Sequence, residues 1–311
     1  MKKWKFGFSV ILAIALWCGA AGADIAYTVV DSGYSAGSIG TIMKEEADFT
    51  IGALKSGFGG DPWVYSFIDA DGKDKAVLRE FQYSGDNDSV YIYDPIDLNA
   101  PIANTNKWGR NLYGVAREGE YLYLALQDVY SATGDTSGQV ARIKVGDYDK
   151  DPDKIHAFSA ESIADADYFR KPAGVTVANG KVYVLNQLRD VRYAPLYGEI
   201  VELDLDLNPT GKTARIGKNP SAMAFYDGKL YVACAGGMLG SGEYGSVWEV
   251  SLSNMSAARL VDLERALGAS PAFQAMDITI TPRGTAYILV YNMNWPTIDA
   301  RIYKASVGDL A

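Results

Sequence analysis

"KNPSAMAFYDGKLYVACAGG", residues 218–237, has the pattern of one β-hairpin. Apolar residues lead up to Phe225, Asp227-Gly228 supplies a turn, and Leu230-Tyr231-Val232 leads back. Asp-Gly is among the strongest short-range hairpin signals, because both residues tolerate the positive φ of a tight turn. Similar segments occur elsewhere in the chain, so this stretch predicts the fold through its repetition.

The return strand of this hairpin recurs with an aromatic residue at its centre. Successive centres are 54, 42, 60, 48 and 56 residues apart. Repeats of this length are typical of solenoids, propellers and arrays. The centres are Tyr27 in "DIAYTVVD", Phe81 in "AVLREFQY", Tyr123 in "REGEYLYLAL", Tyr183 in "NGKVYVLN", Tyr231 in "DGKLYVAC" and Tyr287 in "RGTAYILV".

Each hairpin is followed by a third strand that often begins with glycine, as in "GSVWEVSL" from Gly245. A weaker fourth segment comes next, as in "AARLVDL" from Ala257. The strands are short and rich in Val, Ile, Leu and Tyr, which favours β structure. Four antiparallel strands in a repeat of roughly 40–50 residues are typical of a propeller blade, whose faces are buried only by its neighbours.

The predicted fold is an all-β propeller of about six four-stranded blades, in a single domain at residues 24–311. Alternatives of five or seven blades stay open, because the first repeat begins at a return strand and the last ends after a third strand. A chain truncated at its C-terminus is a further alternative. The third strands begin at Gly37, Ser89, Gly138, Gly198, Gly245 and Ala300.

Two of the repeats resemble a known family. "IGKNPSAMAFYDGKLYVACAGG…GSVWEVSL" (216–252) and "RKPAGVTVANGKVYVLNQ" (170–187) are similar to the YVTN-type propeller repeat of exported bacterial proteins. The other repeats match this pattern only in outline. The resemblance implies a propeller fold. It does not transfer a function, because such propellers include lactonases, surface binding proteins and proteins without known activity.

The first 23 residues have the features of a secretory signal peptide. Three lysines lie within the first five residues, residues 6–18 are mostly apolar, and Ala21-Gly22-Ala23 fits a cleavage site. We therefore expect cleavage before Asp24 and export to the periplasm or the extracellular space. No second apolar segment follows, so we expect no transmembrane segment after cleavage.

Charge and cysteine content exclude several classes of function. Residues 1–23 contain three lysines and no acidic residue, so their removal changes the formal net charge from −9 to −12. An acidic surface repels nucleic-acid backbones, and we expect no nucleic-acid partner. Cys234 is then the only cysteine, so no intrachain disulfide can form. His156 is the only histidine, which excludes zinc sites built on several histidines.

The loops are unequal at the two ends of the predicted blades. The hairpin turns are short, whereas the connections from the second to the third strand are long, for example 186–198 and 235–245. These long connections share one rim with the junctions between blades, and loops on a rigid scaffold are where binding residues usually lie. We call this end the long-loop rim.

Aromatic and arginine side chains gather on the long-loop rim, a composition typical of interface anchors. The favoured hypothesis is a non-enzymatic exported propeller that binds a protein or glycan there. The alternative for the tryptophans is that they fill gaps between blades. The predicted binding residues are Trp63, Trp108, Arg110, Tyr168, Phe169, Arg170, Arg189, Arg192, Tyr193, Tyr197 and Trp295.

Two patterns keep other functions open, although we assign no catalytic residue, metal ligand or cofactor. Alternate aspartates in "GDYDKDPDK" (146–154) resemble the opening of a calcium loop, but Pro152 replaces the expected glycine. Polar residues such as Asn186 and Asn292 follow the return strands, where a metal-dependent lactonase or hydrolase would hold its ion in the central channel. A structural component of the cell envelope is a third alternative.

Overall fold

The structure is a computed structural model. It describes residues 24–31, 37–45, 48–58, 62–68, 72, 74–80, 89–94, 97, 100–109, 111–127, 138–158, 161–163, 166–190, 192, 194–237, 243–268, 273–294 and 297–310. The predicted signal peptide at residues 1–23 lies outside this set. The chain divides into two compact units, residues 1–111 with 144–151, and residues 112–143 with 152–311. The single domain expected at residues 24–311 stays a prediction.

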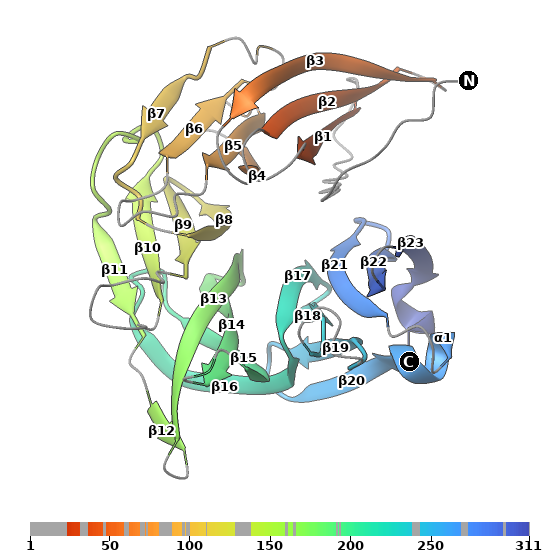
Figure 1. Ribbon diagram of the computed structural model, residues 1–311. Helices are drawn as coiled ribbons and strands as arrows, with labels where there is room; N and C mark the ends of the chain where they lie inside the picture. The colour runs from red at the N-terminus through yellow and green to blue at the C-terminus, as the bar shows by residue number, and fades with distance from the viewer. Residues whose placement is uncertain are drawn as a thin grey trace. The chain divides into compact units, whose positions relative to one another are not determined.

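The first unit contains two antiparallel sheets (Figure 1). One has the order β1-β2-β3 and the other β4-β5-β6-β7. The strands are β1 (Asp24–Asp31), β2 (Gly37–Glu45), β3 (Asp48–Phe58), β4 (Pro62–Ile68), β5 (Asp74–Glu80), β6 (Ser89–Tyr93) and β7 (Ala103–Thr105).

The second unit contains four further sheets, in the orders β11-β10-β9-β8, β12-β13-β14-β15-β16, β17-β18-β19-β20 and β21-β22-β23. Two short helices, α1 (Leu263–Leu267) and η1 (Val307–Asp309), follow β20 and β23. The strands are β8 (Leu112–Glu118), β9 (Tyr121–Leu126), β10 (Gln139–Lys144), β11 (Lys154–Ala157), β12 (Glu161–Ile163), β13 (Ala166–Ala178), β14 (Lys181–Asp190), β15 (Pro195–Leu203), β16 (Pro209–Lys218), β17 (Pro220–Tyr226), β18 (Lys229–Cys234), β19 (Ser246–Ser251), β20 (Ala257–Asp262), β21 (Gln274–Ile280), β22 (Thr285–Asn294) and β23 (Thr297–Ser306).

The fold is an all-β propeller, as predicted. Within the second unit the first strands of successive sheets contact one another, β8 with β13, β13 with β17 and β17 with β21. Figure 1 shows these strands on the inner side of that unit, with β11, β16 and β20 on its outer side. In the part of the chain that the structure describes, no helix has the length and apolar character needed to cross a membrane.

The prediction of about six blades is corrected to five, which was one of its alternatives. β1, which contains Tyr27, lies at the end of its three-stranded sheet and occupies the place of a return strand. Among the described residues that sheet has no inner first strand, and the five sheets from β4 to β23 are the blades. The prediction that Phe81 is the centre of a return strand also needs correction, because the corresponding strand, β5, ends at Glu80. Phe81 lies outside the described residues, and Val77 has the central place instead.

The hairpin turns have the geometry that their sequences predicted. φ is 51° at Asn179 and 68° at Gly180, and 48° and 73° at Asp227 and Gly228. Positive φ at both central residues defines the type I′ turn, whose twist matches that of the flanking strands. The turns thereby fix the register of β13 with β14 and of β17 with β18, down to the pairs Ala178–Lys181 and Tyr226–Lys229.

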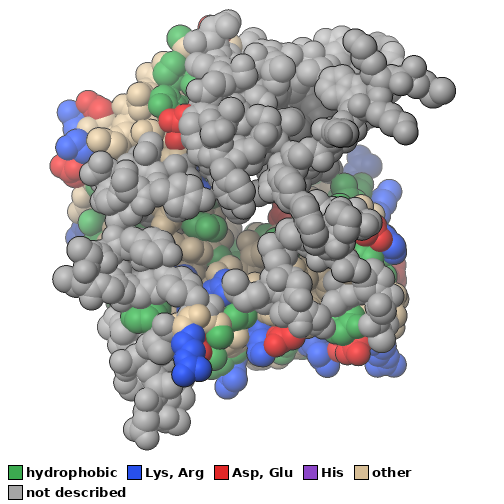
Figure 2. All heavy atoms as spheres, in the orientation of Figure 1, with side chains coloured by type: hydrophobic (Ala, Val, Ile, Leu, Met, Phe, Trp, Pro, Cys, Tyr) green, Lys and Arg blue, Asp and Glu red, His purple; other side chains and the backbone are tan. Residues whose placement is uncertain are grey.

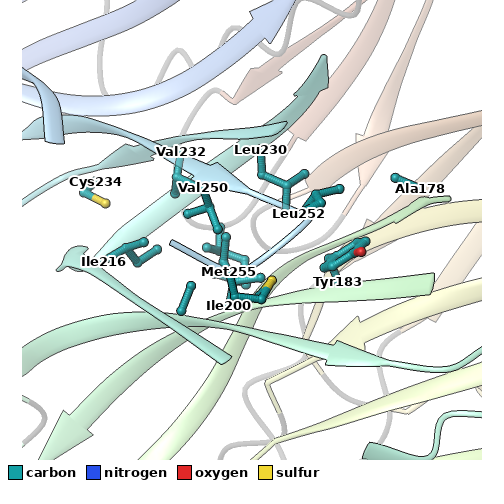
Figure 3. Packing of buried hydrophobic residues seen from close by; sticks show 13 residues of the cluster. Ala178, Tyr183, Ile200, Ile216, Leu230, Val232, Cys234, Val250, Leu252 and Met255 are labelled. Atoms are coloured by element: carbon teal, nitrogen blue, oxygen red, sulfur yellow. The ribbon is translucent and has the colours of Figure 1, made fainter. Parts of the chain in front are cut away.

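The return strands β14 and β18 bury both of their faces, each face against a different neighbouring blade. In β18, Leu230 and Val232 pack with the β12–β16 blade, whereas Tyr231 and Ala233 pack with the β21–β23 blade. Figure 3 shows the first of these clusters, in which Leu230 and Val232 lie above Ile200. Successive side chains of a strand point to opposite faces, so each return strand is buried only when a blade packs on either side of it. This requirement explains why the same sequence pattern recurs along the chain.

The central tyrosines of the return strands also make polar contacts. The Tyr123 hydroxyl donates to the Leu205 carbonyl of the next blade at 2.9 Å, and the Tyr183 hydroxyl donates to Glu202 Oε2 at 3.2 Å. Burial, together with the Glu202 carboxylate, raises the pKa of Tyr183 to about 12. The tyrosine hydroxyl therefore stays a neutral donor at physiological pH.

A β-bulge recurs near the start of the first strands of the second unit. A bulge adds one residue to one strand and increases the local twist. In β17 the bulged residue is Ser221, whose hydroxyl donates to the Ala275 carbonyl of the next blade at 2.9 Å. The register shifts lie between Leu112 and Gly114, Pro172 and Gly174, Pro220 and Ala222, and Ala275 and Asp277.

Glycines at the start of the third strands touch the next blade. The Gly138 N–H donates to the Arg170 carbonyl at 2.7 Å, and the Gly245 N–H donates to the Phe273 carbonyl at 2.8 Å. A Cβ atom at any of these glycines would collide with the neighbouring first strand. The closest neighbours in that strand are Pro172 for Gly138, Pro220 for Gly198 and Ala275 for Gly245.

Candidate functional site on the long-loop rim

Hydrogen bonds tie the long-loop rim of three successive blades of the second unit together. Arg189, near the end of β14, donates from Nη2 to Gln187 Oε1 at 2.8 Å and to Asn219 Oδ1 at 2.6 Å. Gln187 Nε2 donates to the Pro220 carbonyl at 2.8 Å. The end of β14 is therefore held to the start of β17 through two side-chain hydrogen bonds, and the bond from Arg189 to Gln187 links their two donors within β14.

The same chain of contacts continues to the β21–β23 blade. Asn219 Nδ2 donates to the Gly237 carbonyl at 3.2 Å, and Gln274 Nε2 donates to the same carbonyl at 3.0 Å. Gly237 lies just after β18, so the beginning of its long loop is fixed from both sides. We call Gln187, Arg189, Asn219, Gly237 and Gln274 the rim network.

Each member of the rim network was missed by the sequence analysis except Arg189. Asn219 and Gln274 directly precede Pro220 and Ala275, which are the last residues before the bulge in β17 and β21. Lys171 has the same place before Pro172 in β13. A polar residue two positions before the bulged residue of each of these strands was the signal available in the sequence.

Charged side chains of both signs lie on the surface near this network. Lys218 Nζ is 3.2 Å from Glu243 Oε2, and both side chains are about half exposed. Arg192 is exposed, and its backbone N–H donates to Asp190 Oδ1 at 2.8 Å. In Figure 2 basic and acidic side chains are interspersed along the lower edge, where Figure 1 places β16 and β20. The described surface there is mixed in sign.

Arg170 belongs to a buried ion pair within the β12–β16 blade. Its Nε lies 2.5 Å from Glu199 Oε1, and the two side chains are 12% and 9% exposed. Asn186 Nδ2 is 3.4 Å from the same carboxylate oxygen. Truncating one partner of such a pair leaves a buried charge without compensation. The geometry therefore gives Arg170 a structural role in this blade.

Other predicted binding residues pack against the protein itself. Trp108, in the first unit, is 1% exposed, and its Nε1–H donates to the Tyr148 carbonyl at 3.0 Å. This burial favours the gap-filling alternative for Trp108. The Arg215 guanidinium lies 3.7 Å from the ring centre of Tyr197. Lys171 Nζ lies 5.6 Å from the ring centre of Phe169.

The side chains of the remaining predicted binding residues lie outside the described part of the chain. Trp63 and Tyr168 lie in β4 and β13, but the structure describes only their backbone. Arg110, Tyr193 and Trp295 lie outside the described residues. Their role in binding stays a prediction.

The polar residues at the ends of the return strands are buried. Asn186 is 0% exposed, and its Oδ1 has no hydrogen-bond partner among the described residues. Asn292 is buried as well, and burial raises the pKa of the Cys234 thiol. The described residues contain no cluster of three or more His, Cys, Asp or Glu side chains arranged to hold a metal ion.

Three of the four aspartates of the calcium-like segment lie near cationic side chains. Asp153 accepts two hydrogen bonds from Arg142, at 2.7 and 3.2 Å. Asp151 lies 4.0 Å from Lys107, and Asp149 lies 3.9 Å from Lys150. His156 is half-buried in β11 against Phe158, and burial, with the nearby Arg170, lowers its pKa.

Asp277 is a further residue that the sequence analysis missed. By register it has the place of Gly114, Gly174 and Ala222 in the other blades of the second unit. Burial raises its pKa, and the Ile278 N–H that donates to Oδ1 at 2.8 Å offsets this only in part. A carboxylate thus occupies a place where the other first strands have a small residue.

We expect Asp277→Asn to stabilise the protein at neutral pH. A carboxyl whose native pKa is raised destabilises the fold when it ionises, so stability falls as pH rises from the unfolded pKa, about 3.9, through the native pKa. The substitution removes this loss. Thermal unfolding at pH 7 and pH 4 checks it: the gain over wild type should be present at pH 7 and smaller at pH 4. A lower melting temperature at pH 7 would contradict it.

The fold and the rim together define the class of protein: an all-β propeller whose long loops are tied by hydrogen bonds at one rim. No protein-family model and no curated protein matches the sequence. The resemblance to the YVTN-type repeat therefore has no support beyond its quoted residues.

Solved propellers are similar to the chain at low sequence identity. The WD40 domain of Neurospora crassa Pan2 matches with a TM-score of 0.52 and 12% identity, covering 88% of this chain and 72% of that one. A luciferin-regenerating enzyme matches with a TM-score of 0.49 and 13% identity, covering 90% and 86%. An α-L-arabinofuranosidase from Lactobacillus brevis has a TM-score of 0.43 and 12% identity, covering 78% and 89%. The Pan2 likeness supports the fold alone.

Proposed function

We propose that this chain is an exported, non-enzymatic propeller that binds a protein or glycan partner at its long-loop rim. The rim network carries the proposal. It holds the ends of three blades in one arrangement before any partner arrives, through contacts such as Arg189–Asn219 at 2.6 Å. A rim fixed in advance loses less conformational entropy on binding than free loops do.

The nature of the surrounding surface supports a polar partner. Arg192 and Lys218 are exposed beside Glu243 and Asp190, and Gln187 and Asn219 are only partly buried. Charged and amide groups of this kind suit hydroxyl-rich or charged ligands through directional hydrogen bonds. The same proposal has three parts that rest on the sequence. They are export of the protein, a relationship to the YVTN-type repeat, and a mature chain that begins at Asp24.

We expect reversal of the rim charges to weaken binding. Arrays of glycans and of peptides, probed with the exported form of the protein, supply the ligand. The double variant Arg192→Glu with Lys218→Glu should bind it at least about tenfold more weakly than wild type, a loss of about 1.4 kcal/mol. Surface ion pairs contribute little to stability, so the melting temperature should hardly change.

A matched control separates rim charge from total charge. Lys150→Glu with Lys154→Glu makes the same change at exposed residues around the β10–β11 connection. This control should bind as wild type does. The proposal fails if the control loses binding as strongly as the rim variant, or if no array ligand is bound. Calcium or zinc that raised the melting temperature would favour the metal-dependent hydrolase instead.

A further inference from the structure

β23 is the outermost strand of its sheet, whereas the corresponding strands of the other blades in the second unit are covered. The third strands β10, β15 and β19 each pair on their outer side with a further strand, β11, β16 and β20. In the described ranges no strand pairs with the outer edge of β23. Such an edge presents backbone N–H and C=O groups to which another strand can pair.

An apolar side chain on β23 is exposed where its counterparts are buried. Ile302 pairs with Leu289 in the same way as Ile200 pairs with Leu185. Ile302 is 48% exposed, whereas Ile200 and Val247, at the same place of β15 and β19, are 0% exposed. Ile200 and Val247 pack against the following blade and also lie beside an apolar residue of the outer strand, Ala214 or Val261, whereas Ile302 has no such outer-strand neighbour among the described residues.

The charge on β23 is the opposite of the charge at the same place in β15 and β19, where the residues are Glu202 and Glu249. Lys304 pairs with Tyr287 as Glu202 pairs with Tyr183 in the β12–β16 blade. The Glu202 carboxylate lies 3.6 Å from Lys212 of the outer strand β16. Lys304 is exposed and lies 6.0 Å from the ring centre of Tyr287; no carboxylate of the described residues pairs with it. A strand that covers β23 thus needs an acidic residue where β16 has a basic one.

We propose that the outer edge of β23 accepts an extended segment of a partner protein as an antiparallel fourth strand, with a carboxylate beside Lys304 and an apolar side chain opposite Ile302. β16 shows the equivalent arrangement in its own blade. There Lys212 lies beside Glu202 and Ala214 lies opposite Ile200, two residues apart on one face. The partner segment therefore carries an acidic residue two positions before an apolar one. Backbone hydrogen bonds supply affinity in this mode, and alternate side chains supply specificity.

This surface is separate from the long-loop rim, so the two proposals can fail independently. The probes are two synthetic peptides. One has the sequence of β16, Pro209–Lys218, and the other has the same sequence with Lys212→Glu. Fluorescence anisotropy with the full chain should give at least about tenfold tighter binding of the acidic peptide. Hydrogen exchange should show new protection of backbone amides in β23 when that peptide is added.

Charge reversal on the protein provides the specific test. Lys304→Glu should reverse the preference, so that the unmodified β16 peptide binds more tightly than the acidic one. The control Lys154→Glu, on the outer strand β11, should keep the wild-type preference. The rim double variant should also bind the acidic peptide as wild type does.

Three results would overturn the proposal. Neither peptide binds; Lys304→Glu leaves the preference unchanged; or the β23 amides are already fully protected in the free chain, which would mean that another part of the chain covers this edge. Ile302→Ser gives a further readout, because it should weaken acidic-peptide binding without reversing the preference.

Discussion

Gly245→Ala will lower the free energy of unfolding by about 2–4 kcal/mol. A Cβ atom at this position would collide with the backbone nitrogen of Ala275 and come within 2.8 Å of the Cys234 carbonyl oxygen. Overpacking of this kind typically costs about 1–3 kcal/mol. The shift needed to relieve it also strains the hydrogen bond from the Gly245 N–H to the Phe273 carbonyl, worth about 1 kcal/mol.

The reason for this large effect is the contact between blades. Gly245 starts the third strand of one blade, and Ala275 belongs to the first strand of the next. Because both colliding atoms are backbone atoms, no side-chain rotation can relieve the collision. Separating the two strands would open the cluster that contains Val247, Phe273 and Val290.

Urea unfolding followed by circular dichroism measures the loss. Gly308→Ala is the matched control, because a Cβ atom there would meet only Ser306 Oγ, at 3.8 Å. The control should change stability by less than about 0.5 kcal/mol, as exposed substitutions usually do. Equal effects of the two substitutions would mean that close approach between blades is not what selects glycine at the start of the third strands.

The propeller could be predicted because its signals are local. Asp227-Gly228 and Asn179-Gly180 fix their hairpins by backbone preference alone, and the recurring return strand needs only its own residues to be recognised. The number of blades could not be predicted in this way. It depends on whether the first repeat has an inner strand, and that is decided by pairing rather than by the residues of "DIAYTVVD".

The candidate site was harder to predict because burial on the rim is decided by distant partners. Arginine is a residue type that is common at binding surfaces. Arg170 nevertheless forms an ion pair within its own blade with Glu199, which lies 29 positions away in the sequence. Conversely, Asn219 resembles an ordinary turn residue, and its position between Arg189 and Gly237 is apparent only once the blades are packed. Local sequence thus predicted the scaffold better than the roles of side chains on its rim.

Arg142→Met will lower the free energy of unfolding by about 1.5–3 kcal/mol, the usual range for losing hydrogen bonds to charged groups. Arg142 is 8% exposed and binds Asp153 at 2.7 Å and Asp206 at 2.8 Å. It also donates to the Leu205 carbonyl at 3.0 Å and lies 4.1 Å from the ring centre of Tyr121. These hydrogen bonds, above all those with Asp153, raise the pKa of Arg142 despite its burial.

The effect is large because Arg142 joins two blades. It belongs to β10, whereas Leu205 and Asp206 lie in the turn between β15 and β16 of the next blade. Methionine keeps much of the volume and removes the charge, so the loss reports the ion pairs and hydrogen bonds rather than a cavity. Asp153 and Asp206 then lose their shared cation, and their mutual repulsion adds to the loss.

Arg259→Met is the matched control for this substitution. Arg259 also pairs with an aspartate, Asp262 at 2.9 Å, but its side chain is 54% exposed. Exposed pairs contribute about 0–1 kcal/mol and are screened by salt, whereas partly buried pairs are screened much less. The loss from Arg142→Met should therefore persist in 0.5 M NaCl while the small loss from Arg259→Met disappears. If both losses were equal, or both vanished in salt, Arg142 would be a surface charge and the blades would be held together by apolar packing alone.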